Sequence, residues 1–515
     1  MIQKSLLAPL AAAGLLACAM PSLGATLHVE QGALSGKTSD GVEAYLGVPY
    51  AAPPTGANRW KLPQAAPSWQ GTRAATTFAS SCQQELSTGF GPYTPEYMVP
   101  GSVSEDCLYL NVWRPSKPSK TPLPILVWIP GGGYVTGSGS VPVYDGRAMA
   151  AKGVIVVNLN YRLGVFGYLA HPQLAHEGVG AGNYGIADIL AALKWVNTNA
   201  KALGGDSRRI TLAGQSAGSM AIHDLIVNPG ARHLFTQVIS ESGPGMGRPP
   251  VPLAVAETTG QQLMDATGVK TIEQLRALPA DRIMAAEKSL GPGLLRFAPV
   301  VDGQLIPRNP YAGATQADID TPMLAGMNAD EAFSLPSKDL ASLRSETQTF
   351  FANLAPQADA LYGVREGSDY QATSRLLRRE RGLASTSHWV ESRARSSSQP
   401  VYLYLFNHVE PGTEEWGAFH TCEVPYAFDN LKQAPQRDFT AADHQVASKV
   451  SAYWVNFVKT GNPNAGALPD WPRFNPDAPA IMALGVIPAM QPLLTQDKMD
   501  FYHQVSAQGG QLSLF

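Results

Sequence analysis

The sequence predicts an α/β fold in which helices cover a mostly parallel central sheet. Two short segments, residues 124–129 and 154–160, are almost entirely apolar. Strands of this kind are buried on both faces, as the strands of a covered parallel sheet are. Such strands alternate along the chain with segments of helical periodicity, which is typical of α/β proteins. The chain has 515 residues, 44% of them hydrophobic, and can form one large core.

The first residues predict an export signal. Lys4 precedes an apolar stretch, Ser5 to Met20, that is too short to span a bilayer, and small residues follow near position 24. We therefore expect a signal peptide over residues 1–24 and one folded domain over residues 25–515. Lipoprotein processing at Cys18, which would leave a lipid anchor there, is the less expected alternative.

The charge and hydropathy of the remaining chain exclude some classes of partner. The net charge is −3 and the pI is near 6.4, so no broad basic field exists to attract nucleic acid. No later segment is apolar enough for a membrane span. Together with the export signal, this predicts a periplasmic or secreted protein.

Taken in order, the chain begins with short strands and continues with the core of the sheet. Residues 27–32 and 44–50 are expected to form an antiparallel start. A helix is predicted from about Ile186 to Ala202, because its apolar residues recur at helical spacing. Further core strands are predicted at residues 210–213, 237–240, 322–326 and 400–406.

Two segments with a different residue pattern interrupt this alternation, roughly residues 245–320 and 335–395. Their patterns are helical and broken by Pro and Gly, so we expect cap insertions beside the carboxyl edge of the sheet that shape a substrate gorge. The basic cluster of Arg378, Arg379 and Arg381 is expected on a solvated face of the second cap.

The cysteines and one charge pair predict structural contacts. Cys82 and Cys107 bracket a Gly/Pro-rich loop, and a disulfide is the default for such a pair in an exported protein. Cys422 is then unpaired and is expected to be buried and inert. Arg59 and Glu105 are expected to form a structural ion pair.

Ser216 is the candidate nucleophile. It lies in Gly214-Gln215-Ser216-Ala217-Gly218, a G-x-S-x-G sequence between an apolar strand and a segment with helical character. A nucleophile on such a sharp turn needs small neighbours, and the following helix directs its N-terminus and the Ala217 N–H toward a developing oxyanion. Because the chain has 49 glycines, the motif alone would also fit a structural turn.

A serine nucleophile requires a base and a group that orients the base. Seven histidines follow Ser216, and only His420 lies in a loop after a late core strand. His223 falls about two turns along the helix and is expected to point elsewhere. Asp330 and Glu331 both follow a core strand, and periodicity does not choose between them.

A Gly-rich segment predicts further oxyanion donors. Gly131-Gly132-Gly133 follows a buried strand, and glycines allow backbone amides to turn inward. A phosphate-binding loop is the rival interpretation, but the lysine of a P-loop and the G-x-G-x-x-G spacing are both missing.

In these segments the sequence resembles the type-B carboxylesterases, the family that includes the cholinesterases. The matches are residues 47–50, 53–54 and 59, 105–111, 131–134, 160–162, 182–185, 204–206, 214–219, 330–331 and 460–463. They span nearly the whole mature chain and are together highly specific. The resemblance implies an α/β-hydrolase fold with a deep gorge.

Carried over residue by residue, the resemblance implies a Ser216, His420 and Glu331 triad. The family uses Glu at the acid position, which selects Glu331 over Asp330. The implied oxyanion donors are the N–H groups of Gly132, Gly133 and Ala217, and Cys82–Cys107 matches the first disulfide of the family.

One departure bears on the substrate. In cholinesterases the loop closed by that disulfide carries a Trp that holds a quaternary ammonium group, whereas residues 82–107 contain Phe90, Tyr93 and Tyr97 and no Trp. Choline esters are therefore not the expected substrates, although Tyr97 leaves room for a weaker cation site.

We therefore expect hydrolysis of carboxylic esters through an acyl-enzyme, with no cofactor or metal. The same triad could act on amides, carbamates or thioesters, or transfer the acyl group. A catalytically silent binding or adhesion protein on this scaffold is a less expected alternative of another class, because such proteins typically lose the nucleophile or the base. The chain has no N-x-[ST] triplet, which suits a bacterial exported enzyme.

Overall fold

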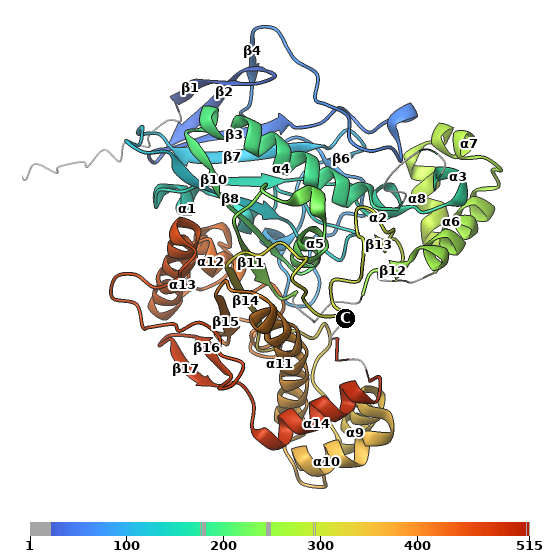
Figure 1. The fold of residues 1–515 in the computed structure, drawn as a ribbon, viewed down its shortest axis with the longest axis vertical. Coiled ribbons are helices and arrows are strands. Elements are labelled where there is room, and N and C mark those ends of the chain that lie inside the picture. The colour runs from blue at the N-terminus through green and yellow to red at the C-terminus, as the bar shows by residue number, and fades with distance from the viewer. Residues whose placement is uncertain are drawn as a thin grey trace, which may run out of the picture.

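A twisted sheet of thirteen strands runs through the part of the chain that the structure describes (Figure 1). The computed structural model describes residues 22–175, 177, 182–243, 249–291, 293, 295–510 and 512–513. Residues 1–21 of the predicted signal peptide, Cys18 among them, lie outside the described residues. The strands of the sheet are β1 (Ser22–Val29), β2 (Gly32–Ser39), β3 (Val42–Pro49), β4 (Thr72–Ala74), β7 (Tyr109–Pro115), β8 (Leu123–Ile129), β9 (Ile155–Leu159), β10 (Gly205–Gln215), β11 (Gln237–Glu241), β14 (Met323–Asn328), β15 (Val401–Phe406), β16 (Ala480–Leu484) and β17 (Ala489–Pro492).

The centre of the sheet is parallel and its first edge is antiparallel. The order is β1-β2-β3-β7-β9-β8-β10-β11-β14-β15-β16-β17, with β4 beside β2. All neighbours from β9 to β16 pair in parallel, whereas β1, β2, β3, β7 and β9 pair antiparallel to one another in turn. Every residue of β9, β11, β14 and β15 is buried, which is why β9, β14 and β15 are apolar at nearly every position. The predicted α/β architecture is confirmed.

Fourteen α-helices surround the sheet in the described residues. They are α1 (Arg147–Ala151), α2 (Gly164–Tyr168), α3 (Pro172–Ala175), α4 (Tyr184–Leu203), α5 (Ala217–Ile226), α6 (Leu253–Thr267), α7 (Ile272–Ala277), α8 (Ala280–Ser289), α9 (Leu340–Phe351), α10 (Ala355–Tyr362), α11 (Tyr370–Ser396), α12 (Val424–Ala427), α13 (Ala441–Thr460) and α14 (Gln496–Ala507). The predicted helix at residues 186–202 is the centre of α4, which crosses the front of the sheet in Figure 1. Two small two-stranded sheets join β5 (Ser81–Cys82) to β6 (Val103–Ser104) and β12 (Val251–Pro252) to β13 (Val300–Val301). Within the described ranges, none of the helices has both the length and the apolar composition of a membrane span.

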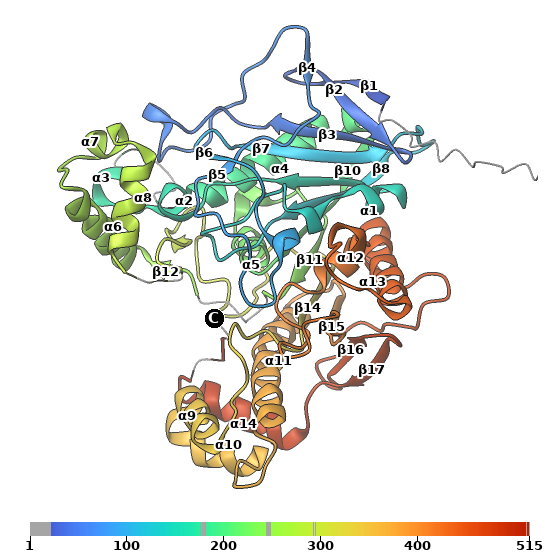
Figure 2. The ribbon, with the colours of Figure 1, turned by 180° about the vertical axis from the view of Figure 1, so that it is seen from behind.

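Two helical groups project from the sheet at separate places. Helices α6–α8 lie together on one side, and α9–α11 lie at the far end with α14, as both views show (Figures 1 and 2). The second group has its own hydrophobic cluster, in which Phe351 of α9 contacts Phe501 of α14 with ring centroids 5.1 Å apart. Helix α14, the last one in the described residues, therefore completes a group that begins about 150 residues earlier.

The prediction of a solvated arginine face on α11 is wrong. Arg381 is only 7% exposed, and its guanidinium lies 4.1 Å from the centroid of the Phe350 ring. Arg378 donates to the Glu346 carboxylate, and Nε of Arg379 donates to the carbonyl of Ala329 at 3.0 Å. The reason is that α11 packs against α9, α14 and β14, so these cations find partners inside the protein.

The predicted structural contacts of the first third of the chain are present. Arg59 Nε donates to Glu105 Oε2 at 2.6 Å, and Arg59 Nη1 also donates to the carbonyl of Leu278 at 2.7 Å. Cys82 and Cys107 form a disulfide. The loop that it closes, residues 82–107, is called the disulfide loop below.

Candidate active site

Ser216 lies on a strained turn between β10 and α5. Its φ is 56°, a value that side-chain-bearing residues rarely adopt. The turn is tight: a Cβ on Gly218 would lie 2.1 Å from the carbonyl oxygen of Ile129, and one on Gly214 would lie 2.7 Å from the backbone of Gly218. Both positions therefore require glycine, as the motif predicts. The Ser216 N–H donates to the carbonyl of Glu241 at 2.9 Å, which fixes the turn against β11.

His420 and Glu331 meet at the same edge of the sheet. Glu331 follows β14, His420 follows β15, and a parallel bridge between Asp330 and Phe419 joins their loops. Nδ1 of His420 hydrogen-bonds to Oε2 of Glu331, and both residues are buried. The adjacent Asp330 instead forms an ion pair with Arg375. The structure therefore brings Glu331, and not Asp330, to the histidine.

The Gly-rich segment after β8 turns beside Ser216. Gly132 has a φ of 116° and Gly133 a φ of 61°. In the described part of the chain, the N–H groups of these two glycines donate to no protein acceptor. Ala217 is the first residue of α5, and the N–H of a first helical residue has no acceptor within its own helix. N–H donors from the loop after β8 and from the start of α5 are thus available near Ser216.

These groups line one cavity of about 490 Å³, here called the main pocket. Ser216, His420, Gly132, Gly133 and Ala217 all contribute to its surface. Much of the remaining surface is aromatic and comes from Phe90, Tyr93, Tyr97, Tyr144 and Phe333. A largely apolar pocket with a few convergent polar groups is the usual form of a small-molecule site.

The disulfide loop forms one wall of the main pocket. The hydroxyl of Tyr93 donates to the backbone carbonyl of His420 at 2.8 Å, and the hydroxyl of Tyr97 donates to Glu410. By contrast, among the described lining residues the first predicted cap segment contributes only Leu295 and the second contributes none. The wall that we expected from the cap helices is thus supplied mainly by the disulfide loop and the loop after β8.

Sequence reasoning missed two residues that hold this site together. Ser242 donates its hydroxyl to Oε1 of Glu331 at 2.6 Å, and the backbone N–H of Asn328 donates to the same oxygen at 2.6 Å. Gln84 accepts from the Thr136 hydroxyl at 2.6 Å and from the Gly137 N–H at 2.9 Å, which ties the disulfide loop to the Gly-rich segment. The position of Ser242 directly after a core strand was a usable signal, whereas the sequence around Gln84 gave none.

Two buried carboxyl groups lie behind the turn. Burial raises the pKa of Glu241 to about 8. Burial, followed by the charges of Glu241 and Glu331, raises the pKa of Glu423 well above its usual range. Nε1 of Trp454 donates to Glu241 at 2.7 Å. The pair therefore retains at least one proton at neutral pH, since two adjacent buried carboxylates would repel.

Two further predicted side chains lie outside the main pocket. His223 is buried, and its Nε2 lies 2.9 Å from the Ser240 hydroxyl, so it points elsewhere as expected. Burial lowers its pKa to about 3, which keeps it neutral. Cys422 is free and buried, and burial raises the pKa of its thiol well above the usual range, so the reactive thiolate does not form.

Comparison with known proteins identifies the family. A family model described as the carboxylesterase family matches residues 24–380 and 369–502. A fumonisin B1 esterase of Sphingopyxis macrogoltabida is 36% identical over 473 residues, covering 87% of this chain and 84% of that protein. A phenmedipham hydrolase of Pseudarthrobacter oxydans is 33% identical over 479 residues, covering 89% of this chain and 94% of that protein.

A solved structure supports the same relationship. The structure of a PNB esterase matches with a TM-score of 0.75 at 29% identity, covering 92% of this chain and 98% of that one. The fold is thus an α/β-hydrolase fold, as the resemblance implies. Sequence and structure agree that the chain belongs to the carboxylesterase family and is a carboxylic-ester hydrolase.

Proposed function

We propose that Ser216 is the nucleophile of this ester hydrolase and that His420 and Glu331 complete its triad. Ser216 Oγ attacks the acyl carbon while neutral His420 takes its proton. His420 then protonates the leaving alcohol, and a water molecule repeats the sequence on the acyl-enzyme. Glu331 holds the imidazole through Nδ1 and stabilises the imidazolium that forms in each step.

The N–H groups of Gly132, Gly133 and Ala217 are proposed to stabilise the oxyanion. They adjoin the serine from two sides, and the N-terminus of α5 adds its positive end. Loss of one such donor costs a serine hydrolase about 10²–10³ in kcat.

The observation that carries the proposal is the hydrogen bond between His420 Nδ1 and Glu331. It joins a buried carboxylate to a histidine that shares the main pocket with a serine held at a φ of 56°. Ser242 and the Asn328 N–H hold the carboxylate from behind, which is the support that an orienting acid requires. A silent binding protein would have no need of this arrangement.

The test is hydrolysis of p-nitrophenyl esters, from acetate to long-chain and aromatic acyl groups, by the wild type and by Ser216→Ala. We expect turnover by the wild type and its loss in a folded variant. Equal activity of both would remove Ser216 from the mechanism. The rate should also fall as acid protonates His420, so a rate that stays flat well below neutral pH would contradict the role of that residue.

The same experiment separates hydrolysis from related reactions. A competing alcohol added to the assay would collect the acyl group if the enzyme transfers it, and the new ester would appear among the products. The relatives are named for different substrates, fumonisin B1 and phenmedipham among them. The panel should therefore include both compounds, together with an amide, a carbamate and a thioester of one acyl group.

We also propose that the protein is exported and acts in the periplasm or outside the cell. The Cys82–Cys107 disulfide supports this, because such bonds persist in oxidising compartments. Cleavage after residue 24 would remove the first residues of β1, which pair with β2 ahead of a register shift. The pairs from Thr26↔Ser35 to Val29↔Gly32 would remain.

Mass spectrometry of the purified mature protein tests the proposed export. We expect an N-terminus near residue 25. A lipidated N-terminus at Cys18 would show the alternative processing, and an unprocessed chain would contradict export through this signal.

A further inference from the structure

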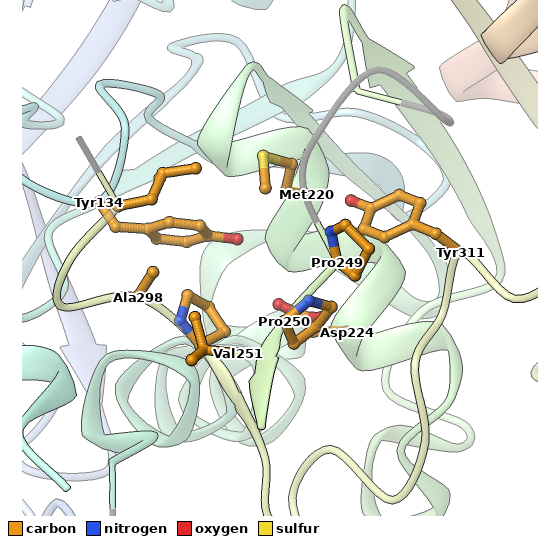
Figure 3. Close-up of a pocket in the computed structure, with 10 residues that line it drawn as sticks. Tyr134, Met220, Asp224, Pro249, Pro250, Val251, Ala298 and Tyr311 are labelled. Carbon is orange, nitrogen blue, oxygen red and sulfur yellow. The ribbon is translucent and has the colours of Figure 1, made fainter. Parts of the chain in front are cut away.

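A second cavity adjoins the main pocket and is here called the side cavity (Figure 3). Its volume is about 80 Å³. Met220 and Leu295 line both spaces, so two unbranched or singly branched side chains form the partition between them. Methionine in particular has three rotatable bonds and adapts its shape easily. These two side chains therefore stand between the side cavity and the main pocket.

The side cavity follows one face of α5 away from the nucleophile. Ser216 immediately precedes α5, Met220 lies one turn along it, and Asp224 lies one turn further. Residues spaced by four lie above one another on a helix, and eight residues correspond to ~12 Å, about the length of an eight-carbon chain. Asp224 lies at the far end of this row from Ser216 and is here called the floor of the side cavity.

That floor is polar although the walls are not. Asp224 is 1% exposed, and its Oδ1 has no hydrogen-bond partner among the described residues. The hydroxyls of Tyr311 and Tyr134 also lack a partner there. In Figure 3 the hydroxyls of Tyr134 and Tyr311 point toward each other across the space, with Pro249, Pro250 and Val251 along the side.

Unpartnered buried groups of this kind indicate an occupant that forms hydrogen bonds. Burial without a partner destabilises a polar group, and native proteins retain few such groups without a reason. No Lys or Arg is among the described residues that line the side cavity. Burial, with a smaller contribution from Asp302, raises the pKa of Asp224 well above its usual range, so the carboxyl is neutral and can both donate and accept.

The occupant that matches these groups is an uncharged hydroxyl. A neutral carboxyl and two tyrosine hydroxyls each offer one donor and at least one acceptor, as an alcohol does. An apolar chain end would leave Asp224 Oδ1 and both tyrosine hydroxyls without a hydrogen-bond partner. An acyl chain that enters the side cavity from Ser216 must also be narrow, because proline and aliphatic side chains line the cavity.

We propose that the side cavity is an acyl-side subsite that selects straight acyl chains of about eight carbons carrying a terminal hydroxyl group. The inference rests on the proposed function, in which Ser216 forms the acyl-enzyme. The leaving alcohol must remain beside His420 to receive its proton, so the acyl arm is the one that turns along α5 past Met220 and Leu295.

The test compares kcat/KM for p-nitrophenyl 8-hydroxyoctanoate with kcat/KM for p-nitrophenyl octanoate. We expect the wild type to prefer the hydroxylated ester by about five- to tenfold, the value of one hydrogen bond to a buried group. Asp224→Leu should bring this ratio to one or below, and Tyr311→Phe should lower it in part. Tyr168→Phe is the matched control, because Tyr168 is a buried tyrosine that packs on Tyr134 outside the side cavity, and its ratio should equal that of the wild type.

The ratio is measured on one preparation with two substrates, so a loss of folded enzyme cancels. A wild-type ratio of one or less, or a ratio that neither Asp224→Leu nor Tyr311→Phe changes, overturns the inference. Turnover of p-nitrophenyl acetate, whose acyl group is too short to reach Met220, reports the proposed function by itself. If the wild type hydrolyses acetate without preferring the hydroxylated chain, only the subsite is refuted; if it hydrolyses no ester, both proposals fail.

Discussion

Asp330 and Glu331 are adjacent carboxylates in entirely different surroundings. Glu331 is buried and accepts hydrogen bonds from His420, Ser242 and the backbone of Asn328. Asp330 pairs with Arg375 and accepts the Ala418 N–H at 3.0 Å. The two side chains thus serve different purposes: one faces the histidine, and the other holds the loop that carries it.

This difference predicts opposite outcomes for two matched substitutions. Glu331→Gln should lower kcat by about 10³–10⁴, because an amide can no longer hold the imidazole in the correct tautomer. Asp330→Asn should keep kcat within about tenfold of the wild type and lower thermal stability instead. Steady-state kinetics and thermal unfolding of both variants decide the matter. A greater loss of kcat in Asp330→Asn would reverse the assignment of the acid.

The sequence alone could not separate these two residues. Both follow the same strand, and the side-chain direction depends on how the loop after β14 meets the loop after β15, a contact between segments some 90 residues apart. The resemblance to a known family selected Glu331. Local pattern was sufficient to predict the sharp turn at Ser216, because the close contacts at Gly214 and Gly218 demand a motif that is visible in the chain itself.

Hydrogen bonds from the disulfide loop hold the loop after β8 in place. Gln84 Oε1 accepts from Thr136 and Gly137, and Gln84 Nε2 donates to the Gly137 carbonyl at 3.0 Å. Oxyanion donors stabilise a transition state only when their positions are fixed in advance. The side chain of Gln84 therefore contributes to the position of Gly132 and Gly133 without touching the substrate.

We expect Gln84→Ala to lower kcat by about 10- to 100-fold, with a smaller change in KM, because the loss falls on the transition state. The neighbouring Gln83→Ala is the control, and its kcat should stay close to that of the wild type. Circular dichroism should show that both variants are folded. Equal kinetics for the two variants would mean that the Gly-rich segment holds its shape without Gln84.

The core strands and the mostly parallel sheet were predictable, whereas the source of the pocket walls was not. Residues 124–129 and 154–160 are apolar because they are buried on both faces, and residues 186–202 show the spacing of a helix packed on a sheet. Which insertion borders the pocket depends on long-range packing. The arginines of α11 show the same limit, since hydropathy alone places Arg381 in water while Phe350 and the helices around it bury it.

Several buried acids make the stability of the protein fall as the pH rises. Burial raises the pKa of Glu241 to about 8, and it raises those of Glu410 and Glu287 to about 7. In the unfolded chain these groups lose their protons near pH 4.3. Between those values the folded state holds more protons than the unfolded state, so stability falls as pH rises.

We expect the free energy of unfolding to fall by about 1–3 kcal/mol between pH 6.5 and 8. The buried His223 and His388, whose pKa values burial lowers to about 3 and 4, act in the opposite direction only until the unfolded chain loses its histidine protons, which it does around pH 6.5. Urea unfolding at several pH values measures the slope.

A substitution tests whether Glu241 causes this pH dependence of stability. Glu241→Gln removes the titrating carboxyl and keeps the acceptor for Trp454, so its stability should depend less on pH than that of the wild type. Glu366→Gln, at an exposed position, should leave the slope as it is. An unchanged slope in Glu241→Gln would exclude Glu241 as its source.

The joining of α14 to α9–α11 has a consequence for how the chain is made. Phe501 and Tyr502 of α14 cover Phe351 and Tyr362, which the ribosome produces some 140 residues earlier. Until Gln496 and the residues after it have been synthesised, the apolar surfaces of α9–α11 have no cover and are open to binding by chaperones. Translation halted before that point would yield a chain with a complete turn at Ser216 and an unfinished helical group, a natural substrate for quality-control proteases.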